Sequence, residues 1–137
     1  MSRVLTASIV ELCSPDHHDD PEIIAGWTRN KSEAGVRAML ATPGNLLLVA
    51  VEGDTVLAVG CIMGGNRIGL NYVDPAHRFR GASSALLVEM ERRVRDAGYG
   101  EVVLESTATA RAFYLARGWQ ETGAGAPRAG YPMRKLL

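Results

Sequence analysis

The chain has 137 residues, 47% hydrophobic and 22% charged, ordinary values for a soluble globular protein that exclude the disordered and fibrous classes. Fifteen basic residues balance fifteen acidic ones, so the net charge gives no electrostatic reason to expect a nucleic acid or an anionic membrane as the main partner. The longest apolar runs, 46–51 and 56–63, are too short to cross a bilayer, and residues 1–8 lack the hydrophobic core of a signal peptide, so we expect one cytoplasmic domain over residues 1–137.

The N-terminal part of the chain predicts one strand followed by two helices. Residues 3–12 alternate weakly between apolar and polar side chains, which favours a strand. Asp20 and Pro21 are typical of an N-cap and a first-turn proline, and Asn30 with Glu33 resembles a capping box. We therefore expect a short helix through Trp27 and a second helix through about Leu40.

Two features that suggest metal or redox chemistry have simpler interpretations. Cys13 and Cys61 lie far apart and have no metal-ligand spacing, so we expect two buried free thiols. Adjacent side chains in the run 17–20, His-His-Asp-Asp, cannot easily point at one ion, and prolines flank the run. The sequence therefore predicts a solvated linker at 17–20 and no metal site.

Two apolar, β-branched segments predict strands at 46–51 and 55–63, and a turn then leads into a third antiparallel strand at 67–73. Two tight turns separate them, at 52–54 (Glu-Gly-Asp) and 64–66 (Gly-Gly-Asn), and both have the composition of hairpin turns. These segments therefore form the antiparallel half of the predicted sheet.

A helix and a parallel strand follow. Leu87, Met90 and Val94 recur at helical spacing, and residues 101–106 are rich in β-branched side chains. A strand, helix and strand of this length form a right-handed parallel crossover, so the segment 101–106 must return beside the strand that ends at Val73. The sheet therefore changes from antiparallel to parallel at this point.

The end of the chain predicts one more helix and a strand pair. Thr107 or Thr109 caps the helix, which we expect to run to Arg117. The segments 119–122 and 131–136 then form a final strand pair around a glycine-rich loop. Gly123, Gly125 and Gly130 in that loop suggest a mobile flap.

The turn before the long helix is the most informative stretch, with the sequence Arg78-Phe79-Arg80-Gly81-Ala82-Ser83. Free N–H groups at a helix N-terminus carry roughly half a positive charge and attract anions. Gly81 permits close approach, and the guanidinium groups of Arg78 and Arg80 match phosphate oxygens. The sequence contains neither the P-loop motif nor the dinucleotide glycine motif. We therefore expect a phosphorylated cofactor other than a hydrolysed nucleotide or a redox dinucleotide.

The order of these motifs resembles the GCN5-related N-acetyltransferase family over residues 46–137. The resemblance is carried by four motifs, Val73-Asp74-Pro75, Arg78-x-x-Gly81-x-Ser83, Ala85-Leu86-Leu87 and Phe113-Tyr114-x-x-x-Gly118-Trp119. The segments 104–107 and 132–137 look like the small-molecule branch of the family. Two positions depart from the family pattern: Ser83 replaces a glycine or alanine, and Phe79 stands where glycine is frequent, which we expect to be tolerated because its side chain can point outward.

The resemblance implies an α/β (α+β) fold with a single mixed, mostly antiparallel sheet, splayed between two parallel central strands and flanked by about four helices. It also implies that the backbone of 79–84 holds the diphosphate of coenzyme A, while that of 71–73 pairs with pantetheine. The two pantetheine amides need backbone partners, which a strand that splays from its neighbour offers. The implied donor-binding residues are Asn71, Tyr72, Val73, Arg78, Phe79, Arg80, Gly81, Ala82, Ser83 and Ser84.

The resemblance also implies catalytic residues. Tyr114 aligns with the tyrosine that acts as general acid near the cofactor sulfur. Its pKa of about 10 exceeds the thiol value of about 8.5, so a hydrogen bond to the thiolate is at least as favourable as complete proton transfer. Only about one amine in a thousand is neutral near pH 7.4 if its pKa is about 10.4, and Glu105 is the candidate base. The alternatives are a water chain, a structural pairing of Glu105 with an arginine such as Arg111, and a proton shuttle at His77, which otherwise is a loop residue.

We therefore predict an acetyl-CoA-dependent N-acetyltransferase in which a primary amine of a small molecule or peptide attacks the thioester directly. The alternative is an acyl-CoA-binding module with little or no catalysis, because folds retain ligand sites after chemistry is lost. Trp27, Tyr72 and Tyr131 are candidates for the acceptor pocket, although aromatic residues near loops also serve packing. The resemblance alone implies a homodimer, and we expect no metal, nucleic acid or membrane partner.

Overall fold

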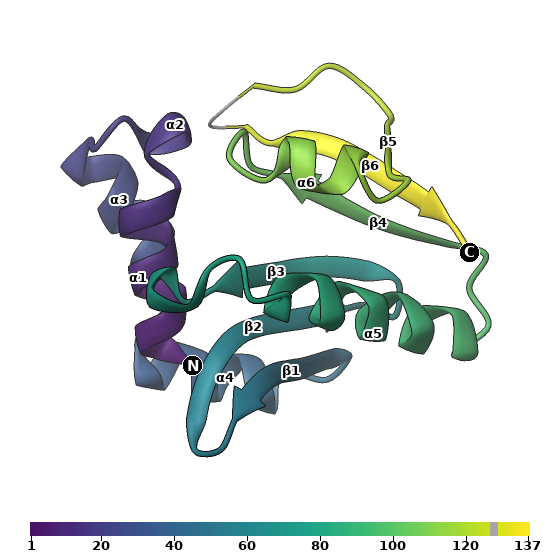
Figure 1. Ribbon diagram of the computed structural model, residues 1–137, viewed down its shortest axis with the longest axis horizontal. Coiled ribbons are helices and arrows are strands. Elements are labelled where there is room, and N and C mark those ends of the chain that lie inside the picture. Colours follow the sequence, from purple (N-terminus) through teal and green to yellow (C-terminus); the bar gives the residue numbers. More distant parts are fainter. Residues whose placement is uncertain (127–128) are drawn as a thin grey trace.

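The computed structural model describes residues 1–126 and 129–137, which form a six-stranded mixed sheet flanked by helices (Figure 1). The strands are β1 (Asn45–Glu52), β2 (Thr55–Met63), β3 (Arg67–Val73), β4 (Glu101–Ser106), β5 (Gln120–Glu121) and β6 (Tyr131–Leu136). The helices are α1 (Ser2–Leu12), α2 (Ser14–His17), α3 (Pro21–Thr28), α4 (Glu33–Ala41), the 3-10 helix η1 (Pro75–His77), α5 (Ala82–Asp96) and α6 (Arg111–Leu115). No helix in this described part is long and apolar enough to cross a membrane.

The sheet has the predicted order of directions. Its strands lie in the order β1-β2-β3-β4-β6-β5, with β3 and β4 parallel and the other neighbours antiparallel. The parallel pair is short, because β3 meets β4 only at Arg67↔Val103 and Ile68↔Leu104. The two strands then diverge, and Figure 1 shows the two halves of the sheet opening away from each other toward α1 and α2. The predicted splay between two parallel central strands is confirmed.

A β-bulge lies where the two central strands separate. The register between β2 and β3 shifts between the pairs Cys61↔Leu70 and Ile62↔Ile68, which leaves Gly69 without a partner. A Cβ atom at Gly69 would lie 2.4 Å from Sδ of Met63, so a larger residue at this position would require the Met63 side chain to move. Bulges bend a strand and increase its twist, so this one directs the second half of β3 away from β4.

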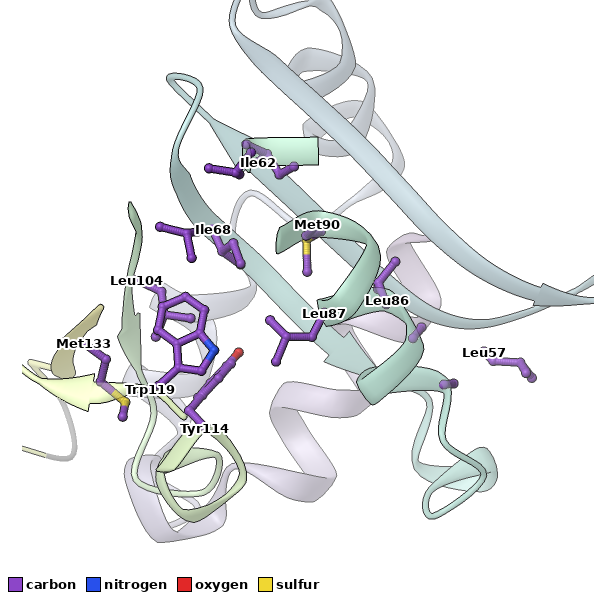
Figure 2. Close-up of a cluster of buried hydrophobic side chains, with 14 residues drawn as sticks. Leu57, Ile62, Ile68, Leu86, Leu87, Met90, Leu104, Tyr114, Trp119 and Met133 are labelled. Atoms are coloured by element: carbon purple, nitrogen blue, oxygen red, sulfur yellow. The ribbon is translucent and has the colours of Figure 1, made fainter. Parts of the chain in front are cut away.

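Helices cover both faces of the sheet and give it two cores. On one face, α5 buries Leu86, Leu87 and Met90 against β2, β3 and β4, and Figure 2 shows these side chains together with those of the strands. On the other face, α1 packs against β2 and β3, and α4 packs against β1. The buried side chains there form the cluster Val4, Leu5, Val36, Met39, Val59, Cys61 and Leu70. Both cysteines are buried free thiols, as predicted.

The predicted first strand is wrong, because residues 3–12 belong to helix α1. The buried positions of α1 are Val4, Leu5, Ser8 and Ile9, a spacing that places one helical face toward the sheet. The small, polar Ser8 interrupts the apolar stripe, so the segment resembles the alternation of apolar and polar side chains that is typical of a strand.

The predicted solvated linker at 17–20 is also wrong at its start, because α2 buries His17 completely. Nε2 of His17 donates to the carbonyl oxygen of Ile9 across 2.8 Å, and its Nδ1 accepts from the backbone N–H of Asp19 at 2.9 Å. Both ring nitrogens are satisfied inside the protein, which removes the reason for this side chain to face water.

The predicted helix starts are confirmed in one case and shifted in the others. Asp20 caps α3 by accepting from the N–H of Glu22 at 2.9 Å. Helix α4 is capped by Ser32, not by Asn30, because the Ser32 hydroxyl accepts from the N–H of Gly35. Helix α6 ends at Leu115 rather than at residue 117, and its N-cap is Ala110 rather than a threonine.

The predicted strand pair at the end of the chain is present as β5 and β6. The glycine-rich loop between these strands includes residues 127 and 128, which lie outside the described residues, so the predicted flap stays a prediction.

Candidate active site

A cavity of about 450 Å³ occupies the gap between β3 and β4. One wall is β3 from Ile68 to Val73, and the opposite wall comes from the end of β4, the loop that follows it and α6. The first residues of α5 and the C-terminal half of α1 complete the lining. The cavity therefore begins where pairing of the two central strands ends, and chain segments from both halves of the sheet meet around it.

The outer part of β3 exposes an unpaired strand edge to this cavity. Residues 70–73 pair with β2 on one side, whereas the register between β3 and β4 ends at Ile68. In an antiparallel pair, alternate backbone N–H and C=O groups point away from the partner strand, and here they point toward the gap. Such unpaired groups can bind a ligand that carries amides, and the pairing of residues 71–73 with pantetheine stays a prediction.

The N-terminus of α5 presents unpaired donors at one end of the cavity. The first backbone bond of the helix runs from the N–H of Ala85 to the carbonyl oxygen of Gly81, at 2.9 Å. Among the residues that the structure describes, none accepts from the N–H groups of 82–84. Gly81 has a φ of +79°, and nothing lies within 4 Å of the position of a Cβ atom there, so the left-handed backbone, not a neighbouring atom, favours glycine.

The two departures from the family pattern are accommodated. Phe79 has a φ of +63°, a left-handed conformation that suits glycine, and the residue is 94% exposed. The ring therefore points outward as predicted, with the guanidinium carbon of Arg78 4.7 Å from its centroid. Ser83 lines the cavity near the free N–H groups of α5.

The two arginines of the turn have different surroundings. Arg78 lines the cavity, whereas Arg80 is not among the lining residues and lies 3.9 Å from a carboxylate oxygen of Glu52. A third arginine, which the sequence analysis does not select, lines the cavity from the segment after α6: Arg117. Its sequence signal is its place directly before Gly118, in the motif that contains Tyr114.

Tyr114 lies in the cavity wall with its ring buried between two aromatic neighbours. Its ring meets those of Phe113 and Trp119 edge to face, with centroids 5.2 and 5.5 Å away, and Figure 2 shows it beside Trp119. Burial raises the pKa of Tyr114 to about 12, and a hydrogen bond from Asn71 Nδ2 to its hydroxyl oxygen, 3.0 Å long, opposes this rise. The Oδ1 atom of Asn71 is buried and has no partner among the described residues.

Glu105 lines the cavity from β4, with 55% of its side chain exposed. Its carboxylate lies 3.5 Å from the guanidinium of Arg67. Arg111 pairs with Glu121 and stacks over the ring of Tyr131 at 4.7 Å. An arginine partner of Glu105 therefore exists, but it is Arg67 rather than Arg111.

His77 belongs to η1 and also lines the cavity. Its Nδ1 lies 3.2 Å from the buried carboxylate of Asp74. The same carboxylate accepts a hydrogen bond from the guanidinium of Arg3 on α1, across 2.6 Å. The hydrogen bond from Arg3 lowers the pKa of Asp74. This cluster ties α1 to the end of β3.

Helix α1 and the residue that follows it supply the remaining wall. Ser8, Leu12 and Cys13 line the cavity there, and burial raises the pKa of the Cys13 thiol to about 11. Of the aromatic residues predicted for the acceptor pocket, Tyr72 lines the cavity, whereas Trp27 and Tyr131 are not among the lining residues. Within residues 1–126 and 129–137, no group of three or more His, Cys, Asp or Glu residues is arranged to hold a metal ion.

A mixed sheet whose parallel central strands diverge beside a helix N-terminus and a buried tyrosine is the architecture of an N-acetyltransferase. The family model of the acetyltransferase (GNAT) domain matches residues 13–137, so the chain belongs to this family, as the sequence motifs indicate. No curated protein sequence resembles the chain closely enough to count as a relative.

Solved structures of this family share the fold at low sequence identity. A GCN5-related N-acetyltransferase from Rhodopseudomonas palustris is 23% identical with a TM-score of 0.87, over 99% of this chain and 87% of that one. The PaiA N-acetyltransferase from Thermoplasma acidophilum, in complex with coenzyme A, is 19% identical with a TM-score of 0.77, over 99% of this chain and 90% of that one. An aminoglycoside 6'-N-acetyltransferase, also complexed with coenzyme A, is 14% identical with a TM-score of 0.67, over 98% and 89%.

Proposed function

We propose that the chain transfers an acetyl group from acetyl-CoA directly to a primary amine of a small molecule or peptide. The observation that carries this proposal is the cavity between β3 and β4, with unpaired N–H groups of α5 at one end and the Tyr114 hydroxyl in its wall. Coenzyme A in the similar Thermoplasma and aminoglycoside acetyltransferase structures supports the same class of donor.

The residues around the cavity fit such a donor. The free N–H groups of 82–84 and the guanidinium of Arg78 are suited to bind the diphosphate. The unpaired edge of β3 at 71–73 is suited to pair with the pantetheine amides. When bound, acetyl-CoA supplies an activated thioester, and a backbone N–H on this edge would polarise its carbonyl group.

Tyr114 would stabilise the departing thiolate by donating a hydrogen bond. Its pKa of about 12 exceeds that of an ordinary thiol by several units. At about 1.4 kcal/mol per unit, complete proton transfer from the phenol would cost roughly 5 kcal/mol, so a shared proton is the more favourable arrangement. This role needs the phenol proton to be free, which agrees with the Tyr114 oxygen acting as acceptor toward Asn71.

Glu105 would take the proton of the attacking amine, directly or through water. It lies on β4 in the same cavity wall as Thr107 and is half-exposed, so bulk water can reach its carboxylate. An amine with a pKa of about 10.4 must lose a proton before it attacks, a cost of roughly 4 kcal/mol near pH 7.4 that a base offsets.

Calorimetry with acetyl-CoA, combined with thiol release over a panel of primary amines, tests the proposal. We expect binding and turnover with at least one class of amine. Binding without turnover on any amine would instead favour the acyl-CoA-binding module, and absence of binding would overturn the proposal.

A variant that introduces a negative charge tests the proposed diphosphate site directly. Ser83→Asp puts a carboxylate among the free N–H groups of α5, where it competes with the diphosphate, so coenzyme binding should be lost. Ser32→Asp is the matched control, because it makes the same change at the N-cap of α4, which lies away from the cavity. Equal coenzyme affinity of the two variants would contradict the assignment of the diphosphate to α5.

A further inference from the structure

Arg117 is a cationic side chain held over the cavity without a carboxylate partner. Most arginines that the structure describes lie within 4.0 Å of a carboxylate oxygen, and Arg117 does not. Among the unpaired ones, only Arg78 and Arg117 line the cavity within the described part of the chain. A guanidinium that lines a ligand-sized cavity and has no carboxylate partner is suited to bind an anionic group of the ligand.

The protein fixes the orientation of this guanidinium. Nε and Nη2 of Arg117 donate to the hydroxyl oxygen of Ser84 across 3.2 and 2.8 Å, and Nη1 donates to the carbonyl oxygen of Phe113 at 2.9 Å. The guanidinium carbon also lies 3.7 Å from the centroid of the Phe113 ring. A guanidinium has five N–H donors, so one N–H on each terminal nitrogen has no acceptor among the described residues.

These contacts place Arg117 at the start of α5. Ser84 belongs to the first turn of that helix, whose N–H groups at 82–84 lack acceptors. Arg117 reaches Ser84 from the segment after α6, on the other half of the splayed sheet, so the two halves meet over the end of the cavity where donors are free.

We infer that Arg117 binds the diphosphate of the donor beside Arg78, in place of Arg80, the second arginine that the sequence predicts for this role. This inference rests on the proposed function, because it assumes that coenzyme A occupies the cavity. Ser84 then acts as a positioning residue, because its hydroxyl holds the guanidinium of Arg117. Its own backbone N–H also faces the diphosphate site as a free donor. The preset orientation reduces the loss of side-chain freedom when two parallel N–H groups meet phosphate oxygens.

The test compares two ligands that differ in the diphosphate. Coenzyme A carries the diphosphate, whereas pantetheine lacks it and keeps the amides and the thiol. Arg117→Met should weaken coenzyme A binding about 10- to 100-fold, as expected for hydrogen bonds to a charged group, and leave pantetheine binding within about twofold of wild type. Arg37→Met is the matched control, because Arg37 is an exposed arginine on α4 outside the cavity lining, and its coenzyme A affinity should stay unchanged.

Two further measurements separate the alternatives. Arg117→Lys keeps the charge without the fork, so an intermediate loss is expected, and this variant serves if the methionine variant does not fold. With 3'-dephospho-coenzyme A, Arg117→Met should show the same fold loss, whereas disappearance of the loss would assign Arg117 to the 3'-phosphate and overturn the inference. Equal losses for coenzyme A and pantetheine, or none, would also overturn it. A wild-type protein that binds no coenzyme A would refute the proposed function itself.

Discussion

The side-chain amide of Asn71 on β3 donates a hydrogen bond to the hydroxyl oxygen of Tyr114 on α6, across 3.0 Å. The bond joins the two halves of the splayed sheet and fixes the polarity of the phenol, because the oxygen acts as acceptor toward Asn71. Phe113 and Trp119 hold the ring by edge-to-face contacts. Tyr114 is therefore oriented so that its proton is left for a partner in the cavity.

Replacing Tyr114 by phenylalanine tests the role of that proton. The ring and its packing remain, while the donor to the thiolate is lost. We expect kcat to fall about 10- to 100-fold, the size of one hydrogen bond to a charged group, with coenzyme A affinity nearly unchanged. Steady-state thiol release and calorimetry measure the two quantities, and an unchanged turnover would remove the assigned role.

The pH dependence of the wild-type rate tests whether the Tyr114 phenol stays protonated. Burial raises its pKa to about 12, so the phenol keeps its proton throughout the range from pH 7 to 10. Over this range, we therefore expect the pH profile of kcat to have the same shape in wild type and in Tyr114→Phe. A falling limb in the wild type that is missing in the variant would show that the phenol loses its proton in that range.

Asn71→Asp tests the polarity of the Asn71–Tyr114 bond. A carboxylate at this position can only accept, so it would draw the phenol proton away from the cavity. We expect a loss of kcat similar to that of Tyr114→Phe and little additional loss in the double variant, because both changes remove the same donor. Thiol release by the two single variants and the double variant measures this coupling, and additive losses would show that Asn71 acts independently of Tyr114.

Glu105→Gln tests the proposed base, with Glu101→Gln as the matched control on the same strand. Glu101 pairs with Arg134 and is not among the cavity-lining residues. We expect kcat/KM of Glu105→Gln to fall about 100-fold with an amine of high pKa. The loss should shrink with an amine of lower pKa, which needs less help to lose its proton. An equal loss with both amines would indicate a structural role through Arg67 instead.

The central part of the fold is predictable because its signals are local. The turns at 52–54 and 64–66 and the crossover from β3 to β4 follow from residues close together in the chain, and the structure has them as expected. Helix α1 is different. Its buried face contains Ser8. A short segment with a polar residue in its apolar stripe fits the period of a helix and the period of a strand almost equally well.

The parts of the site that sequence analysis misses depend on contacts between remote residues. Asn71 reaches Tyr114 across 43 positions of the chain, and Arg117 reaches Ser84 across 33. The residue types alone do not reveal these partners. An arginine directly before Gly118 is equally compatible with a solvated helix end, and only its place above the N-terminus of α5 distinguishes the two cases.

The Arg3–Asp74 pair predicts a loss of stability in acid. The hydrogen bond from Arg3 lowers the pKa of the buried Asp74 below its value in the unfolded chain, about 3.9. This contribution is present above that value and disappears as the pH falls through the folded-state pKa. Below about pH 4, the free energy of unfolding of wild type should therefore decline more steeply than that of Asp74→Asn, in urea titrations at pH 7 and pH 3. Parallel declines would contradict this account.

Asp16→Asn should loosen the loop that precedes α6. The buried carboxylate of Asp16 accepts from the N–H groups of Ala108 at 2.5 Å and Thr109 at 3.1 Å, and from the Thr109 hydroxyl at 2.8 Å. The amide of asparagine has one acceptor oxygen for these three donors, so we expect a loss of about 1–3 kcal/mol in the free energy of unfolding. Denaturant titration measures this loss.

Hydrogen exchange locates the effect of Asp16→Asn within the chain. The N–H groups of Ala108 and Thr109 should exchange faster in the variant, whereas that of Ala85, which bonds within α5, should keep its protection relative to global unfolding. Asp54→Asn, in the turn between β1 and β2, is the control for the charge change and should leave Ala108 and Thr109 protected. Equal exchange at Ala108 in wild type and Asp16→Asn would show that other contacts hold the loop, and α2 would then have no part in placing the helix that carries Tyr114.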